Sequence, residues 1–131
     1  MRLWHQALIP KLPSRQLLGQ HRECCAMRGK GWGKRHSTVD YAFTHEPALL
    51  VAYHLLIIKE MQNRGYKPSS IWKNPEYRGR ALGFCENWCS PSEVNPYLRT
   101  ALLRNDIIFP EHDGSYLAEC IENLNRKGIV V

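Results

Sequence analysis

The sequence has no apolar run of the roughly 18 residues needed to cross a bilayer. It also has no apolar signal segment at its start, no internal repeat, and no paired CxxC knuckles of the kind that hold zinc. These absences argue against a membrane protein, a repeat protein and a typical zinc domain. Five cysteines in a chain without a secretion signal are expected to be reduced and mostly buried. We therefore expect a cytoplasmic protein that uses no cofactor and no metal.

Acidic residues are scarce in the first quarter of the chain. Residues 1–36 contain eight Lys/Arg and one acid, Glu23, whereas the remaining residues contain ten Lys/Arg and eleven acids. The net charge of +6 therefore arises from the N-terminal segment. Such a concentration of positive charge favours a polyanionic partner. Nucleic acid is the first expectation, because no basic stretch is joined to a lipid-binding amphipathic face.

Hydrophobic periodicity predicts helices and no strands. The chain has 131 residues, of which 44% are hydrophobic, so it is long enough for one domain with its own core. The expected helices are 17–28 after a Ser14 cap, 44–64 from a Thr44 cap, about 95–104, and 114 or 115 to about 127. We predict an all-α fold, a compact single domain spanning residues 1–131 with about four helices and long connecting loops.

The helix predicted over residues 17–28 has an unusual polar face. Arg22 and Glu23 share it with Gly19 and Ala26. The small residues leave room for a bulky group to approach between the charges. The alternative is an ordinary solvated face on which the small residues have no role.

The segment after this helix, GKGWGKRHSTV, combines glycines with basic residues around one tryptophan. Lys30, Lys34 and Arg35 suit contacts with phosphates, and the glycines allow a close backbone approach. Trp32 has two readings, stacking on a base or packing into the core. His54, in the most apolar helix, is expected to be a hydrogen-bonded core residue.

Several of these motifs together resemble the pyrimidine-dimer DNA glycosylase family of the phage endonuclease V type. They are the short arm MRL, the helix QLLGQHRE, the basic glycine-rich loop, and THEPALLVAYH leading through KEMQNRGY to NPEYRG. The likeness covers residues 1 to about 80. It implies an all-α fold and an enzyme that acts on double-stranded DNA at damaged or abasic sites, as a monomer.

The resemblance also implies roles for individual residues. The N-terminal α-amine attacks deoxyribose C1′, the base leaves, and β-elimination cleaves the strand. A helix glutamate, matching Glu23, assists, while Arg2, Arg22 and Arg28 match basic residues that hold phosphates and the lesion. Because the large Arg2 side chain normally prevents methionine removal, we expect Met1 itself to carry the nucleophilic amine.

The C-terminal region departs from the family, because it ends NRKGIVV without an aromatic cluster. Two alternatives therefore stay open at this point. One is a nucleic-acid-binding protein that keeps the fold without the chemistry. The other is a small zinc protein that uses its cysteines and histidines.

Overall fold

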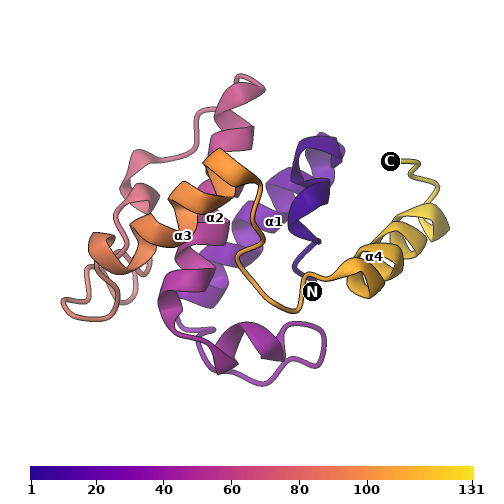
Figure 1. Cartoon of the computed structure of the whole chain (residues 1–131). Helices are drawn as coiled ribbons and strands as arrows, with labels where there is room; N and C mark the ends of the chain where they lie inside the picture. Colours follow the sequence, from indigo (N-terminus) through magenta and orange to yellow (C-terminus); the bar gives the residue numbers. More distant parts are fainter.

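Helix α2 (Pro47–Asn63) forms the centre of the computed structural model, which describes residues 1–131 (Figure 1). The other elements, in chain order, are η1 (Gln6–Lys11), α1 (Ser14–Arg28), η2 (Asp40–Thr44), η3 (Ser70–Lys73), α3 (Pro91–Arg104) and α4 (Gly114–Arg126). The four α-helices and three short 3₁₀ helices confirm the all-α prediction. The only β interaction is an isolated bridge between Tyr77 and Phe84.

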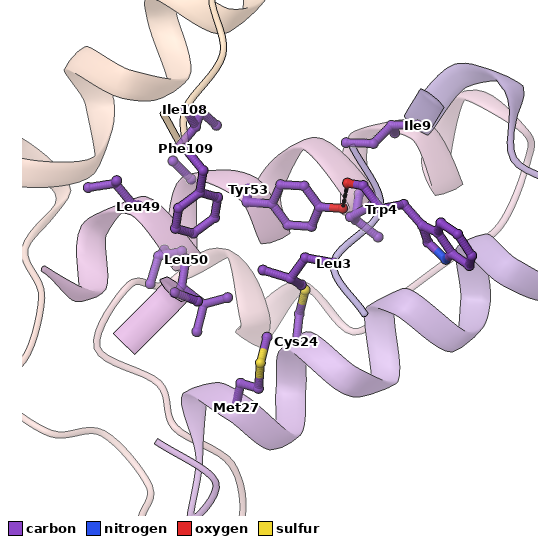
Figure 2. Close-up of a cluster of buried hydrophobic side chains, with 14 of the residues drawn as sticks. Leu3, Trp4, Ile9, Cys24, Met27, Leu49, Leu50, Tyr53, Ile108 and Phe109 are labelled. Atoms are coloured by element: carbon purple, nitrogen blue, oxygen red, sulfur yellow. Dashed lines mark hydrogen bonds between the residues drawn. The ribbon is translucent and has the colours of Figure 1, made fainter. Parts of the chain in front are cut away.

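The sequence of α2 explains its central place. The stretch ALLVAYHLLII is apolar nearly all round, and a helix of this kind is stable only when other elements cover it. Helices α1 and α3 and the short η1 pack against it. Figure 2 shows this core, in which Tyr53 lies between Phe109 and the N-terminal residues Leu3 and Trp4. Cys24, Cys89 and Cys120 are buried as small apolar residues, as predicted.

Three predicted helix starts were wrong. Ser14 lies inside α1, because Pro13 occupies the cap position, and Thr44 ends η2 instead of capping α2. Helix α3 begins earlier than expected, at Pro91. The Ser90 side chain accepts from the helix backbone, while the Glu93 carboxylate accepts from the Ser90 N–H at 3.1 Å. This reciprocal capping box starts the helix at Pro91, ahead of the start expected at Asn95 and Pro96.

Helix α4 lies apart from the α1–α2–α3 group and packs beside the N-terminal arm (Figure 1). The Tyr116 hydroxyl donates to the Leu3 carbonyl at 2.5 Å, and Cys120 and Leu124 are buried. The side chain of Asp113 caps the helix by accepting from the Tyr116 N–H at 2.8 Å. The two ends of the sequence therefore meet on one side of the molecule. None of the helices combines the length and apolar character needed to span a membrane.

Candidate active site

The first four residues form an extended arm that is bonded to α1. Leu3 and Trp4 are buried in the core and anchor the arm. The Trp4 N–H donates to the Gln20 side-chain oxygen at 2.7 Å, and the Gln20 amide donates to the Arg2 carbonyl at 2.8 Å. The Thr38 hydroxyl also donates to the Met1 carbonyl. These bonds fix the beginning of the chain against the middle of α1.

This arrangement brings Met1 and Glu23 together. Both line a surface pocket of about 290 Å³, and the remaining lining residues are Arg2, Trp4, Thr38, Asn123 and Lys127. Met1 as a whole residue is 46% exposed to solvent. The pocket therefore presents an amine and a carboxylate in a setting rich in positive charge.

The Glu23 carboxyl group is half-buried, and this burial raises its pKa above the ordinary value. The positive charge of the N-terminus opposes the rise most strongly, followed by the Arg2 backbone, Lys127 and Arg22. The order of these effects indicates that the N-terminal amine is the dominant charge next to Glu23. A carboxyl group with a raised pKa is suited to giving and taking protons.

A second, more apolar pocket of about 200 Å³ also includes Met1. Lys34, Arg35 and His36 of the glycine-rich loop lie around it, and its apolar side is formed by Ala26, Met27, Val39 and Phe43. Lys34 and Arg35 are exposed, as phosphate-binding residues must be. The small residue Ala26 of the predicted polar face thus does border an open space.

The other predicted contact residues occupy different environments. Arg22 and Lys30 are exposed. Arg2 is half-buried: its guanidinium lies 3.4 Å from Glu119 and over the Tyr116 ring. Trp32 is half-buried with its ring edge-on to Phe43 and Trp88, at centroid distances of 5.2 and 5.5 Å. The Trp32 side chain is therefore mainly packed against other aromatic residues, which agrees with the second of its two predicted roles.

Arg28 does not belong to the DNA-facing set, contrary to the prediction. Its side chain is 0% exposed and donates to the carbonyls of Trp72, Asn74 and Tyr77 at 2.8–2.9 Å. Burial lowers its pKa to about 10. Arg28 turns inward because the loop after α2 offers three carbonyls that need donors, and it therefore fixes that loop to the end of α1.

A cluster of His21, Cys25 and His54 lies beside Arg28, with ligand-type atoms within 4.8 Å of one another. An arginine only donates, so His54 Nδ1, 3.0 Å from Arg28, must accept. The proton of neutral His54 then lies on Nε2 and is donated to His21 Nδ1 at 2.8 Å. Burial lowers the pKa of His54, and the charge of Arg28 adds to this effect. This hydrogen-bonded chain uses the lone pairs that a zinc ion would require, and it confirms His54 as a core histidine.

Sequence reasoning missed five residues of the Met1–Glu23 site: Trp4, Gln20, Thr38, Asn123 and Lys127. Gln20 carried a usable signal, since it lies one turn before Glu23 on the same helix. Lys127 carried none, because it comes from the far end of the chain. Its ammonium lies 5.3 Å from the centroid of the Trp4 ring, which holds it at the edge of the pocket.

One of three comparisons with known proteins identifies a family for this chain. Searches of curated proteins and of solved structures returned no significant match. A family model described as pyrimidine dimer DNA glycosylase, however, matches residues 1–74. The matched segment contains the arm, α1, the glycine-rich loop and α2, and so includes both Met1 and Glu23. DNA is accordingly the substrate class, and the chain belongs to the pyrimidine dimer DNA glycosylase family.

Proposed function

We propose that this glycosylase also cleaves the DNA strand at the abasic site, with the α-amine of Met1 as nucleophile and Glu23 as the proton-transfer group. The observation that supports the proposal is the shared pocket: the first residue of the chain and the half-buried glutamate of α1 line one open space. The basic N-terminal segment around this pocket suits a DNA backbone.

The proposed reaction begins with a bond between the uncharged amine and C1′ of the damaged nucleotide. The bond from C1′ to the base breaks, and the base leaves with the electron pair and a proton. The amine then loses its proton, the bond between C1′ and O4′ opens, O4′ takes a proton, and an imine remains. Glu23 next removes a proton from C2′, and the bond between C3′ and the phosphate oxygen breaks.

Substrate binding is assigned to the exposed cations near the pocket. In this proposal the phosphates are contacted by Arg22, Lys30, Lys34 and Arg35. Lys127 also contacts them, although it lies outside the family match. Arg2 is held at the pocket by Glu119 and Tyr116 and acts next to the reacting sugar. The pyrimidine dimer is the expected lesion, because it is the substrate named by the family.

Borohydride trapping tests the proposal directly, because it reduces an imine to a stable adduct. The native protein, with any tag at the C-terminus, is incubated with abasic and with ultraviolet-irradiated duplexes. We expect adducts with both. Glu23→Gln should lower the rate of strand cleavage by at least 100-fold, in line with loss of an acid–base group, whereas Glu122→Gln, at an exposed position of α4, should not.

Mass mapping of the adduct identifies the amine. Attachment at Met1 supports the proposal, while attachment at Lys127, the other amine of the pocket, would refute it. Adduct formation by a protein whose N-terminus is acetylated would also refute it. Salt-sensitive binding without any adduct would favour the alternative, a DNA-binding protein that keeps the fold without the chemistry.

A further inference from the structure

The side chain of Gln20 is hydrogen-bonded to Glu23 and to the arm that begins with Met1. It is 1% exposed and lies between the N-terminal arm and α2. Its Nε2 group donates to the Arg2 carbonyl at 2.8 Å and to Glu23 Oε2 at 3.2 Å. Its oxygen accepts from the Trp4 N–H at 2.7 Å.

The remaining partner of Gln20 connects this network to the core. The hydroxyl of Tyr53, a fully buried residue of α2, donates to the Trp4 carbonyl at 2.6 Å (Figure 2) and lies 3.0 Å from the Gln20 oxygen. A primary amide has two protons and two lone pairs. Gln20 donates both of its protons, one of them to the carboxylate, and its oxygen accepts directly from Trp4.

We propose that Gln20 is a positioning residue that holds the Met1 amine and the Glu23 carboxylate at a fixed separation. This inference rests on the proposed function of that pair. One rigid amide sets the position of the arm through Arg2 and Trp4 and the orientation of the carboxylate through Oε2. If Gln20 only held the arm in place, it would not need the hydrogen bond to Glu23. If it only oriented Glu23, it would not need the hydrogen bonds to Arg2 and Trp4.

The expected effect follows from the geometry of the reaction. A displacement of about 1 Å at reacting groups lowers rates on the order of 100-fold. Loss of the Gln20 amide frees both groups at once, but it leaves the exposed cations of the glycine-rich loop in place. The rate of chemistry should therefore fall much more than the affinity for DNA.

The first test is Gln20→Met, which keeps the length of the side chain and removes the hydrogen bonds of the amide to Arg2, Trp4 and Glu23. The rate of imine trapping at saturating abasic duplex and the dissociation constant for the same duplex are both measured. We expect the trapping rate to fall about 10- to 100-fold and the dissociation constant to change less than about 3-fold. Gln16→Met, one turn earlier on α1, is the matched control and should leave both unchanged.

The second test is Gln20→Glu, whose carboxylate still accepts from Trp4 and Tyr53 but places a negative charge against Glu23. When protonated, this side chain donates one hydrogen bond again. The other charges that act on Glu23 are those of the Met1 amine, Lys127 and Arg22, and they act equally in the native protein. We therefore expect the ratio of variant to native trapping rate to rise as the pH falls from 8 to 5.

The outcomes separate the two proposals. If the native protein forms no adduct at Met1, the proposed function fails, and the role of Gln20 fails with it. If the native protein forms the adduct while folded Gln20→Met is trapped at the native rate, the positioning role alone is overturned. Parallel losses of stability, affinity and rate in Gln20→Met, with a pH-independent ratio for Gln20→Glu, would show a structural brace and would overturn it too.

Discussion

At the residue scale, Glu23 shows how the burial of an ionisable group lowers the stability of the fold when that group is charged. Its carboxyl group is half-buried, and burial raises its pKa despite the positive charge of the N-terminus. The native state therefore binds the Glu23 proton more tightly than the unfolded chain does. The contribution of Glu23 to stability is greatest when it is protonated and declines as the pH rises through its raised pKa.

The direction of this pKa shift leads to a prediction for Glu23→Gln, because a glutamine side chain resembles the protonated, uncharged form of glutamate. The variant should unfold at a higher temperature than the native protein at pH 7, and the difference should shrink toward zero below about pH 4, where the native carboxyl is protonated in both states. Thermal unfolding monitored by circular dichroism at the two pH values measures this. A lower midpoint for the variant at pH 7, or a difference that does not depend on pH, would contradict it.

Arg28 and Arg35 illustrate what a sequence does not reveal about single residues. Both are basic residues close together in the same positively charged segment, yet Arg28 is buried and Arg35 is exposed. The difference depends on three carbonyls contributed by residues 72–77, far along the chain. No local pattern around Arg28 encodes that contact, so the prediction of a phosphate contact there was wrong.

At the element scale, the loop of residues 29–39 is the part of the molecule best suited to meet DNA. It carries exposed Lys34 and Arg35 beside the apolar pocket that Met1 borders. Its backbone turns sharply at Gly33, where φ is +77°, a conformation that side chains disfavour. In the proposed function, these two cations contact the phosphate backbone beside the pocket.

Removal of these cations should change the salt dependence of binding. Lys34→Ala together with Arg35→Ala should make the slope of log affinity against log salt concentration shallower by about 2, because each phosphate contact contributes roughly 0.9. Fluorescence anisotropy with a labelled abasic duplex at several salt concentrations measures the slope. Lys59→Ala, an exposed position on α2, is the control. An unchanged slope in the double variant would show that this loop does not contact the backbone.

The elements themselves were largely predictable, and the reason is periodicity. The apolar runs of α1, α2 and α4 extend over several turns, so their presence and type were expected from the sequence. The start of α3 was missed because its capping box lies inside a proline- and glycine-rich stretch that read as irregular. Likewise, the pairing of Met1 with Glu23 was expected only through the resemblance, since nothing in residues 1–4 shows that Gln20 will hold them.

At the scale of the whole molecule, α4 belongs to the site, and this could not be predicted from the N-terminal sequence. It lies beyond the residues matched by the family model, yet it contributes Asn123 and Lys127 to the pocket. It is joined to the arm through Tyr116 and Glu119. The C-terminal region therefore completes the pocket with residues of its own.

Lys127→Met tests this contribution, because methionine keeps an apolar side chain over Trp4 and removes the charge. Lys127 lowers the pKa of Glu23, so its loss should raise that pKa and move the acid limb of the cleavage rate profile to higher pH. Affinity for an abasic duplex should fall about 3- to 10-fold, as expected for one lost phosphate contact. The control is Lys67→Met, at an exposed position after α2. If the acid limb of Lys127→Met lies at the same pH as that of the native protein, or at a lower pH, the assignment of Lys127 to the site would be contradicted.

The pocket joins residue 1 to residue 127, and this has a consequence for the protein while it is being made. A ribosome releases the arm and α1 well before it releases α4. A nascent chain that has already formed α1 and α2 still lacks one wall of the pocket and one of its cations. If the proposed reaction takes place in this pocket, an unfinished polypeptide is therefore expected not to nick DNA.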